Sequence, residues 1–269
     1  MKLTLIMSKK NVRAKKHLGQ HFLTDTATAE RIVNTLQPEG RYQQVLEVGP
    51  GMGVLTRLLL AREAEFRTQV VELDRESVAY LETNFPELRG LIFNQDFLKS
   101  DWATALETPF ALIGNFPYNI SSPIFFKVLE LRDQIPEVVG MLQKEVAERI
   151  AAPPGSRTYG ILSVFLQAFY RIEYCFDVPP EVFDPPPKVQ SGVIRLTRNA
   201  RPELPIPEKF FRQLVKQAFS MRRKTLRNAL KSWQLPKSLT QQPVFDLRAE
   251  RLSVEDYLEL GKAIREVQA

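Results

Sequence analysis

The chain has 269 residues, which is enough for one large core or for a main domain with a smaller one. Its residues are 44% hydrophobic and 25% charged, and no apolar run approaches the roughly 20 residues that span a bilayer. The stretch Met1 to Met7 is too short for a signal peptide, and the single Cys175 excludes a disulfide within the chain. These features predict a soluble, cytoplasmic protein that does not bind membranes.

The net charge of +6 is concentrated at the two ends of the chain. Residues 1–20 carry six Lys and Arg and no acid, residues 21–197 carry 16 basic and 23 acidic residues, and residues 198–269 carry 15 basic and 8 acidic residues. Concentrated basic segments suit the phosphate backbone of nucleic acid. We predict a basic arm over residues 1–20, of which Lys9 to Lys16 is mobile until it meets a partner, and a basic C-terminal segment that binds a phosphate backbone. The alternative is that these cations belong to solvated helix faces.

The first predicted elements have the order of a nucleotide-type α/β fold. A helix capped by Thr24 or Asp25 is followed by a strand over residues 44–48, the glycine turn Gly49–Gly53 and a helix over residues 54–64. The turn has the spacing Gly-x-Gly-x-Gly and lacks the lysine of a triphosphate-binding loop. Its backbone is therefore expected to approach a nucleoside without phosphates, such as S-adenosylmethionine.

Successive predicted strands end in polar residues that suit such a ligand. Glu72 stands at the end of the strand 68–73, where an acid can accept both ribose hydroxyls. Asp96 follows the strand 91–95, where a carboxylate can accept the adenine amino group. Either acid alone would more often be an ordinary surface acid. Their recurrence, together with Gly49 after the first strand, indicates one ligand site at the edge of a parallel sheet.

The quartet Asn115–Tyr118 follows the apolar run 110–113, which is typical of a buried parallel strand. In a doubly wound order this strand lies beside the first one, so the quartet and the glycine turn share a crevice. The exocyclic nitrogen of adenine is a poor nucleophile until its N–H groups are drawn onto acceptors. Asn115 Oδ1 and a carbonyl held beside Pro117 can be those acceptors, and Tyr118 can stack on a base removed from its helix. In isolation, the quartet would equally suit a turn with a buried aromatic residue.

The next part of the chain completes the predicted sheet. Strands are expected over residues 138–142, 170–176 and 191–196, and helices over residues 122–131 (capped by Ser121 or Ser122), 144–150 and 159–167. Five prolines in residues 179–188 are expected to forbid sheet pairing there and to stiffen the loop. Phe183 would stand on this rigid rim and clamp the second face of a base that lies on Tyr118. The alternative for Phe183 is a core position beneath the loop.

A proline-punctuated linker over residues 198–207 is the predicted boundary between an α/β domain, residues 21–200, and a helical domain, residues 201–269. The helical domain is expected to begin with a helix over residues 208–219 and to end with a helix introduced by a capping box of Ser253 and Asp256. Its densest positive patch is expected on a short helix, where it suits contact with nucleic acid, and consists of Arg222, Arg223, Lys224 and Arg227.

Over nearly its whole length, the chain resembles the small-subunit ribosomal RNA dimethyladenosine transferases of the KsgA type. The matching stretches are Gly19–Leu23, Glu47–Gly53, Glu72–Asp74, Gln95–Asp96, Asn115–Asn119, Leu142–Val146, Val178–Val189 and Phe219–Asn228. The resemblance implies a Rossmann-like class I S-adenosylmethionine-dependent methyltransferase domain, with a seven-stranded, mostly parallel sheet, and a small all-helical C-terminal domain. It also implies dimethylation of N6 on two adjacent adenosines near the 3′ end of 16S rRNA in the small ribosomal subunit.

The resemblance also assigns roles to residues. Cofactor contacts fall on His21, Leu23, Gly49, Glu72, Asp96 and Asn115, and the catalytic residues are Asn115, Pro117 and Tyr118. His21 stands where the family usually has Asn, and Phe116 where it usually has Leu. We expect a monomer that contributes to small-subunit biogenesis and uses no metal, since His17 and His21 have no Cys or His partners at ligand spacing.

Two other functions remain open at this stage. The first is a large-subunit (23S) rRNA adenine methyltransferase of the antibiotic-resistance type, which resembles this chain around Gly49 and Asn115 but less over residues 178–189 and 219–228. The second is an RNA-binding assembly factor on the same scaffold, for which methylation is secondary. The presence of Glu72, Asp96 and Asn115 favours an active enzyme.

Overall fold

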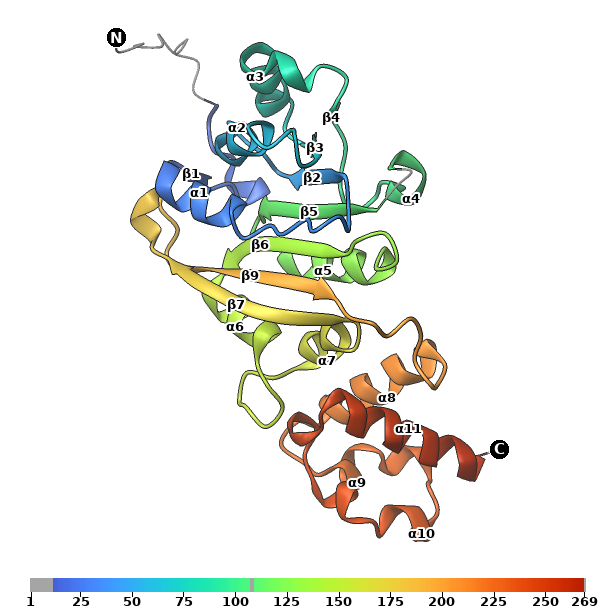
Figure 1. Ribbon diagram of the computed structural model, residues 1–269. Coiled ribbons are helices and arrows are strands. Elements are labelled where there is room, and N and C mark those ends of the chain that lie inside the picture. Colours follow the sequence, from blue (N-terminus) through green and yellow to red (C-terminus); the bar gives the residue numbers. More distant parts are fainter. Residues whose placement is uncertain (1–11, 107–108, 269) are drawn as a thin grey trace.

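A seven-stranded sheet lies at the centre of the molecule (Figure 1). The computed structural model describes residues 12–106 and 109–268, so the expectations for Met1 to Met7, Lys9 and Lys10 fall outside the described residues. In spatial order the strands are β4 (Ile92–Phe93), β3 (Arg67–Val71), β2 (Gln44–Val48), β5 (Phe110–Asn115), β6 (Glu137–Gln143), β9 (Ser191–Arg198) and β7 (Tyr170–Val178). The first five strands are parallel, and β9 is antiparallel to both of its neighbours.

Strands β2 and β5 are neighbours, as predicted, with Leu46 paired to Leu112. Because parallel strands end at the same edge of a sheet, the glycine turn after β2 and the quartet after β5 lie at one edge. The side chains of both strands are buried on each face, which explains their nearly continuous apolar sequences.

Helices cover both faces of the sheet. Val45 and Ile113 belong to the buried cluster that contains α1 (Thr26–Val33) and α2 (Val54–Leu60), whereas Leu46 and Leu112 belong to the cluster on the opposite face. The other helices of this part are α3 (Arg75–Asn84), α4 (Trp102–Ala105), α5 (Ser121–Glu130), α6 (Lys144–Ala151) and α7 (Ile161–Gln167). This doubly wound arrangement is the predicted Rossmann-like fold.

The proline-rich loop pairs with another strand, contrary to the prediction. Strand β8 (Phe183–Asp184) is antiparallel to β1 (Phe22–Leu23). Pairing is possible because the prolines occupy positions 179, 180 and 185–187, so both residues of β8 keep their N–H groups. This two-stranded sheet joins the N-terminal segment to the loop between β7 and β9.

The C-terminal part is helical and packs beyond α7 (Figure 1). It contains α8 (Glu208–Ser220), α9 (Leu226–Ala229), α10 (Lys237–Thr240) and α11 (Val254–Gln268). Phe211 of α8 is 1% exposed and contacts Phe165 of α7, with 6.0 Å between their ring centroids. One continuous apolar cluster therefore joins this part to the sheet, even though the linker over residues 198–207 interrupts the regular structure.

Two of the predicted helix caps are present. Asp25 Oδ2 accepts a hydrogen bond of 2.7 Å from the Thr28 amide, and Ser253 and Asp256 form a reciprocal capping box at α11. The predicted cap of α5 is wrong, because Ser121 is the first helical residue and its Oγ donates to the Tyr118 carbonyl at 3.2 Å. Ser121 thus fixes the turn that follows the quartet.

Candidate functional site

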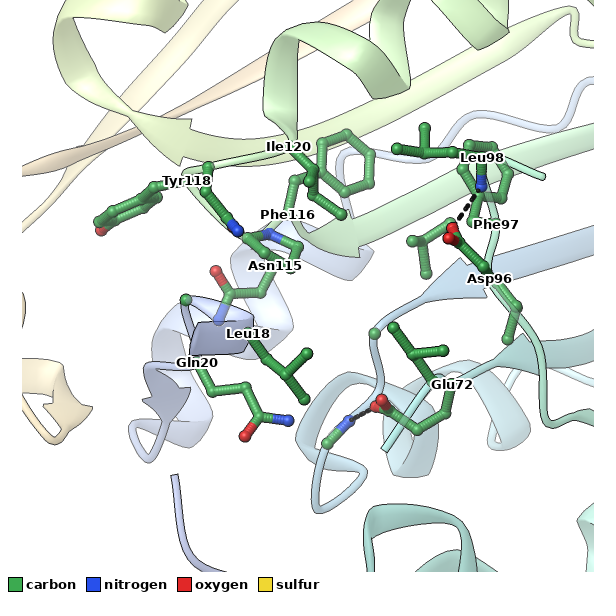
Figure 2. A pocket seen from close by; sticks show the side chains of 18 of the residues that line it. Leu18, Gln20, Glu72, Asp96, Phe97, Leu98, Asn115, Phe116, Tyr118 and Ile120 are labelled. Atoms are coloured by element: carbon green, nitrogen blue, oxygen red, sulfur yellow. Dashed lines mark hydrogen bonds between the residues drawn. The ribbon is translucent and has the colours of Figure 1, made fainter. Parts of the chain in front are cut away.

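A pocket lies at the carboxyl ends of β2, β3 and β5 (Figure 2). It brings together most of the residues that the sequence predicted for the site: His21, Gly49, Glu72, Asp96, Asn115, Pro117 and Tyr118. It is also lined by apolar side chains that the sequence analysis missed: Leu18, Leu73, Phe97, Leu98 and Ile120. Leu73 and Phe97 could have been found, because each directly follows an acid at the end of a predicted strand.

Glu72 is held by the backbone at the edge of the pocket. Its Oε2 accepts from the Gly51 amide at 3.1 Å, and its Oε1 accepts from the Asp74 amide at 2.8 Å. The residue is 5% exposed, and this burial raises the pKa of its carboxyl group. Gly51 has φ 56°, and a Cβ there would lie 2.8 Å from the Phe22 ring, so glycine is required at this turn.

Asp96 lies across the pocket from Glu72, as Figure 2 shows. Its Oδ1 accepts from the Leu98 amide at 2.9 Å, and its Oδ2 lies 3.5 Å from Lys99 Nζ. A carboxylate has further lone pairs beyond these two contacts, so Asp96 can still accept from a ligand amino group.

Asn115 is oriented by one hydrogen bond. Its Nδ2 donates to the His21 carbonyl at 2.8 Å. Since a carbonyl can only accept, this contact assigns the amide orientation and leaves Oδ1 as the acceptor at the pocket. An acceptor at this place is what the role predicted for Asn115 needs, and the role itself stays a prediction.

The backbone of the quartet offers a second acceptor. The Pro117 carbonyl accepts from the Ile120 amide at 3.1 Å, and the Tyr118 carbonyl accepts from Ser121 Oγ. No described residue donates to the Phe116 carbonyl, whereas the Phe116 amide donates to the Met141 carbonyl at 2.9 Å. The residue before proline is conformationally restricted, so the Phe116 carbonyl is held in place without a protein donor.

Tyr118 is positioned by a hydrogen bond at its hydroxyl and by a neighbouring ring. Its hydroxyl hydrogen-bonds Ser191 Oγ at 2.7 Å, and burial raises its pKa. The imidazole of His21 lies beside it, with ring centroids 5.5 Å apart and planes tilted by 30°. His21 Nδ1 donates to the Pro185 carbonyl at 2.8 Å. The side chain of His21 therefore joins the tyrosine to the proline-rich loop.

Two predicted site residues lie elsewhere. Phe183 is 4% exposed and belongs to the buried cluster beneath the loop, so the alternative core position is correct and the rim position is wrong. It is drawn inward because β8 pairs with β1. Leu23 lines a small neighbouring cavity beside Glu47 and Met52, and not the main pocket.

The C-terminal cations are arranged differently from the prediction. Arg222, Arg223 and Lys224 lie in the turn before α9, and not on a helix. Arg222 donates to the carbonyls of Arg157 and Tyr159, so it joins this turn to the loop before α7. Arg227 of α9 pairs with Asp246 at 2.5 Å and also donates to the Thr240 carbonyl. The side chains of Arg223 and Lys224 are exposed and have no partner among the described residues.

The described part of the basic arm is attached to the pocket. Lys15 Nζ lies 2.5 Å from Asp74 Oδ1 and 3.4 Å from Glu76 Oε1, and the Lys15 amide donates to Gln20 Oε1 at 2.9 Å. Figure 2 shows Leu18 and Gln20 near Asn115, on the side of the pocket away from Asp96. Lys15 thus has acidic partners at the start of α3, and the mobility of the arm stays a prediction.

Glu47 is a buried acid beneath the glycine turn. It is 1% exposed and accepts from Thr56 Oγ1 at 2.6 Å. Desolvation is the main cause that raises its pKa to about 8, and the nearby Glu72 adds to the shift. Burial therefore favours the protonated form of this side chain in the folded protein.

We expect the stability of the protein to fall as pH rises from about 4.5 to about 8, with a contribution from Glu47 of at most about 1.4 kcal/mol per pH unit. In this window the folded state keeps a proton that the unfolded state has lost. Glu47→Gln should remove this contribution. In urea unfolding, the free energy of unfolding of the variant should therefore increase relative to that of the wild type as pH rises. Parallel curves for the two proteins would contradict the assignment, and the exposed Glu63→Gln is the control.

No group of three or more His, Cys, Asp or Glu among residues 12–106 and 109–268 is placed to hold a metal ion. Within the same residues, no helix combines the length and apolar character needed to cross a bilayer.

The chain is similar in sequence to known RNA methyltransferases. The chain is 59% identical over 249 residues to the ribosomal RNA small subunit methyltransferase A of Cytophaga hutchinsonii, covering 93% of this chain and 96% of that protein. It is 55% identical over 254 residues to the protein of the same name from Flavobacterium johnsoniae, covering 94% and 96%.

Solved structures agree on the architecture. A dimethyladenosine transferase from Plasmodium falciparum superposes with a TM-score of 0.76 at 23% identity, over 92% of this chain and 98% of that chain, which shows the fold. The 23S rRNA methyltransferase ErmE has a TM-score of 0.64 at 26% identity, over 91% and 99%. The family model described as ribosomal RNA adenine dimethylase matches residues 11–266. With this match over nearly its full length, and with 59% identity to one relative, the chain belongs to the ribosomal RNA adenine dimethylase family.

Proposed function

We propose that the protein dimethylates N6 of two adjacent adenosines near the 3′ end of 16S rRNA, within the small ribosomal subunit. The observation that carries the proposal is the pair of acceptors, Asn115 Oδ1 and the Phe116 carbonyl, beside a pocket lined by Glu72 and Asp96. The names of the relatives from Cytophaga hutchinsonii and Flavobacterium johnsoniae support the small-subunit substrate.

The residues of the pocket fit S-adenosylmethionine. We assign the ribose hydroxyls to Glu72, the adenine amino group to Asp96 and the close backbone approach to Gly49, which has φ 69°. Leu73 is 53% exposed on the same wall, an apolar surface suited to a purine face. When bound, this cofactor supplies an electrophilic methyl group carried on a sulfonium.

The quartet would prepare the adenine amine for methylation. Two N–H groups that donate to Asn115 Oδ1 and to the Phe116 carbonyl favour a more tetrahedral nitrogen, whose lone pair is less delocalised into the ring. Tyr118 would stack on the everted base, a contact worth about 1–3 kcal/mol. No strong general base lies among these residues, so positioning and exclusion of water carry the rate. The N–H becomes acidic only after methylation, and solvent can take the proton.

We propose that residues 201–269 bind the RNA backbone and that residues 21–200 hold the catalytic pocket, in a cytoplasmic monomer. Within the predicted patch, the side chains of Arg223 and Lys224 have no partner among the described residues. Their charges are therefore available for contacts with phosphates. This assignment leaves Arg222 and Arg227 to stabilise the helical part through their internal partners.

We expect Arg223→Ala to lower the salt dependence of RNA binding by about one unit in the slope of log K against log salt. The reason is that an exposed cation releases about one counterion on meeting a phosphate. Arg222→Ala should instead lower the melting temperature and change the slope less, because its guanidinium donates to two carbonyls. Filter binding at several salt concentrations measures both, and an unchanged slope in Arg223→Ala would place that cation outside the interface.

We expect Lys15→Met to raise the Kd for S-adenosylmethionine about twofold to fivefold and to leave the salt slope of RNA binding unchanged. Lys15 is paired with Asp74, whose amide donates to Glu72, so its role lies with the cofactor pocket. The neighbouring exposed Lys16→Met is the matched control for charge. A lower slope with an unchanged Kd in Lys15→Met would assign the lysine to RNA.

The function is tested by transfer of labelled methyl groups to 30S particles that lack the modification. We expect up to four methyl groups per particle, two on each of two adenosines, and none on 50S particles or DNA. Transfer to 50S particles instead would support a large-subunit enzyme. Binding to 30S particles without methyl transfer would support an assembly factor.

A further inference from the structure

The ring of Phe116 lies across two glycines of the sheet. Gly114 of β5 and Gly140 of β6 are in-register partners. A Cβ on Gly140 would lie 2.5 Å from Cε2 of Phe116, and a Cβ on Gly114 would lie 2.9 Å from Cε1. One edge of the fully buried Phe116 ring therefore covers the α-carbon of Gly114, and the other edge covers that of Gly140. The ring has space there because neither glycine carries a side chain.

The position of this ring affects the acceptor pair. Phe116 directly follows Asn115, its amide is bonded to the Met141 carbonyl, and its ring makes an edge contact with Phe125 of α5 at 5.9 Å between centroids. A side chain at position 140 would push the Phe116 ring away from the sheet and shift the Phe116 backbone. That backbone carries one acceptor, the Phe116 carbonyl, and it directly follows Asn115, which carries the other.

We infer that Gly140 is a positioning residue for methyl transfer, matched in size to Phe116. The inference rests on the proposed function, because it concerns the two proposed acceptors. Gly140 does not line the pocket, so its effect must pass through the ring. Gly114 is less informative, since its Cβ would also lie 2.5 Å from the Val48 carbonyl oxygen.

The test compares Gly140→Ala, Phe116→Leu and the double variant on 30S particles. We expect Gly140→Ala to lower kcat about tenfold to a hundredfold, as misplacement of reacting groups does. Phe116→Leu should lower it less, because the smaller side chain loosens the turn. The double variant should recover to within about threefold of the wild type, since the added methyl occupies space that the smaller side chain releases. The Kd for S-adenosylmethionine should stay within about twofold of the wild-type value in all three.

Gly261→Ala is the matched control for overpacking. Its Cβ would also meet a side-chain atom at 2.5 Å, Ile206 Cδ1, but in α11 and outside the pocket. It should lower the melting temperature and leave kcat unchanged. The inference fails if Gly261→Ala lowers kcat as much as Gly140→Ala does, or if Gly140→Ala keeps the wild-type kcat.

Should Gly140→Ala not fold, the double variant decides the question. A kcat above that of Phe116→Leu supports the matched pair, and a kcat at or below it overturns the inference. Methyl transfer by the wild type separates the inference about Gly140 from the proposed function. Wild-type transfer to 30S particles without coupling between positions 116 and 140 refutes only the inference, whereas no wild-type transfer refutes the proposed function.

Discussion

Asn115→Ala is expected to lower kcat for methyl transfer by at least about 10²–10³-fold, while binding of the RNA persists. The expected size is that of removing one preorganised hydrogen-bonding group from a site where charge develops. Asn115 Oδ1 is the side-chain acceptor of the proposed pair, and its orientation is fixed by the donation of Nδ2 to the His21 carbonyl. Alanine removes the acceptor, and water that fills the space would not be held in the same place.

The measurement is single-turnover methyl transfer with saturating cofactor, together with the Kd for S-adenosylmethionine and for RNA. The Kd for the cofactor matters because the variant also loses the bond to the N-terminal segment. Asn115→Asp separates the two contributions, since it keeps an acceptor oxygen but cannot donate to the carbonyl. Asn84→Ala in α3 is the control at a site away from the pocket, because the side-chain amide of Asn84 donates to the Tyr80 carbonyl of the same helix. Undiminished turnover in Asn115→Ala would remove this side chain from the mechanism.

The arrangement of the pocket could be predicted because it follows from local patterns. Apolar runs separated by helical segments indicate parallel strands, and parallel strands bring their carboxyl ends to one edge. Gly49, Glu72, Asp96 and Asn115 each follow such a run, so their convergence required no knowledge of long-range contacts. The neighbouring positions of β2 and β5 completed the argument.

The errors concern contacts between segments far apart in the chain. The pairing of Phe22 with Asp184 joins positions 162 residues apart, and a strand of two residues has no detectable periodicity. This pairing draws Phe183 into the core, which the proline pattern alone could not indicate. Similarly, the partners of Arg222 are two backbone carbonyls of a distant loop, and backbone groups are present in every sequence.

Glu72→Gln is expected to raise the Kd for S-adenosylmethionine about tenfold to a hundredfold, the range for lost hydrogen bonds to a charged group. Both carboxylate oxygens of Glu72 already accept from backbone amides, of Gly51 and Asp74. A glutamine has one acceptor oxygen, so its NH₂ group would face one of these amides and disturb the glycine turn. Because the loss affects binding, kcat at saturating cofactor should fall much less than in Asn115→Ala.

The pH dependence of cofactor binding gives a sharper test of Glu72. Burial raises the pKa of this carboxyl group, and the ionised form is the stronger acceptor for ribose hydroxyls. Affinity in the wild type should therefore weaken as pH falls through the raised pKa, at a higher pH than an exposed glutamate would cause. Glu72→Gln should lose this component of the pH dependence, and the exposed Glu82→Gln should retain it. If the wild type and Glu72→Gln weaken in parallel on acidification, the proton that controls binding resides on another group, and Glu47 becomes the next residue to replace.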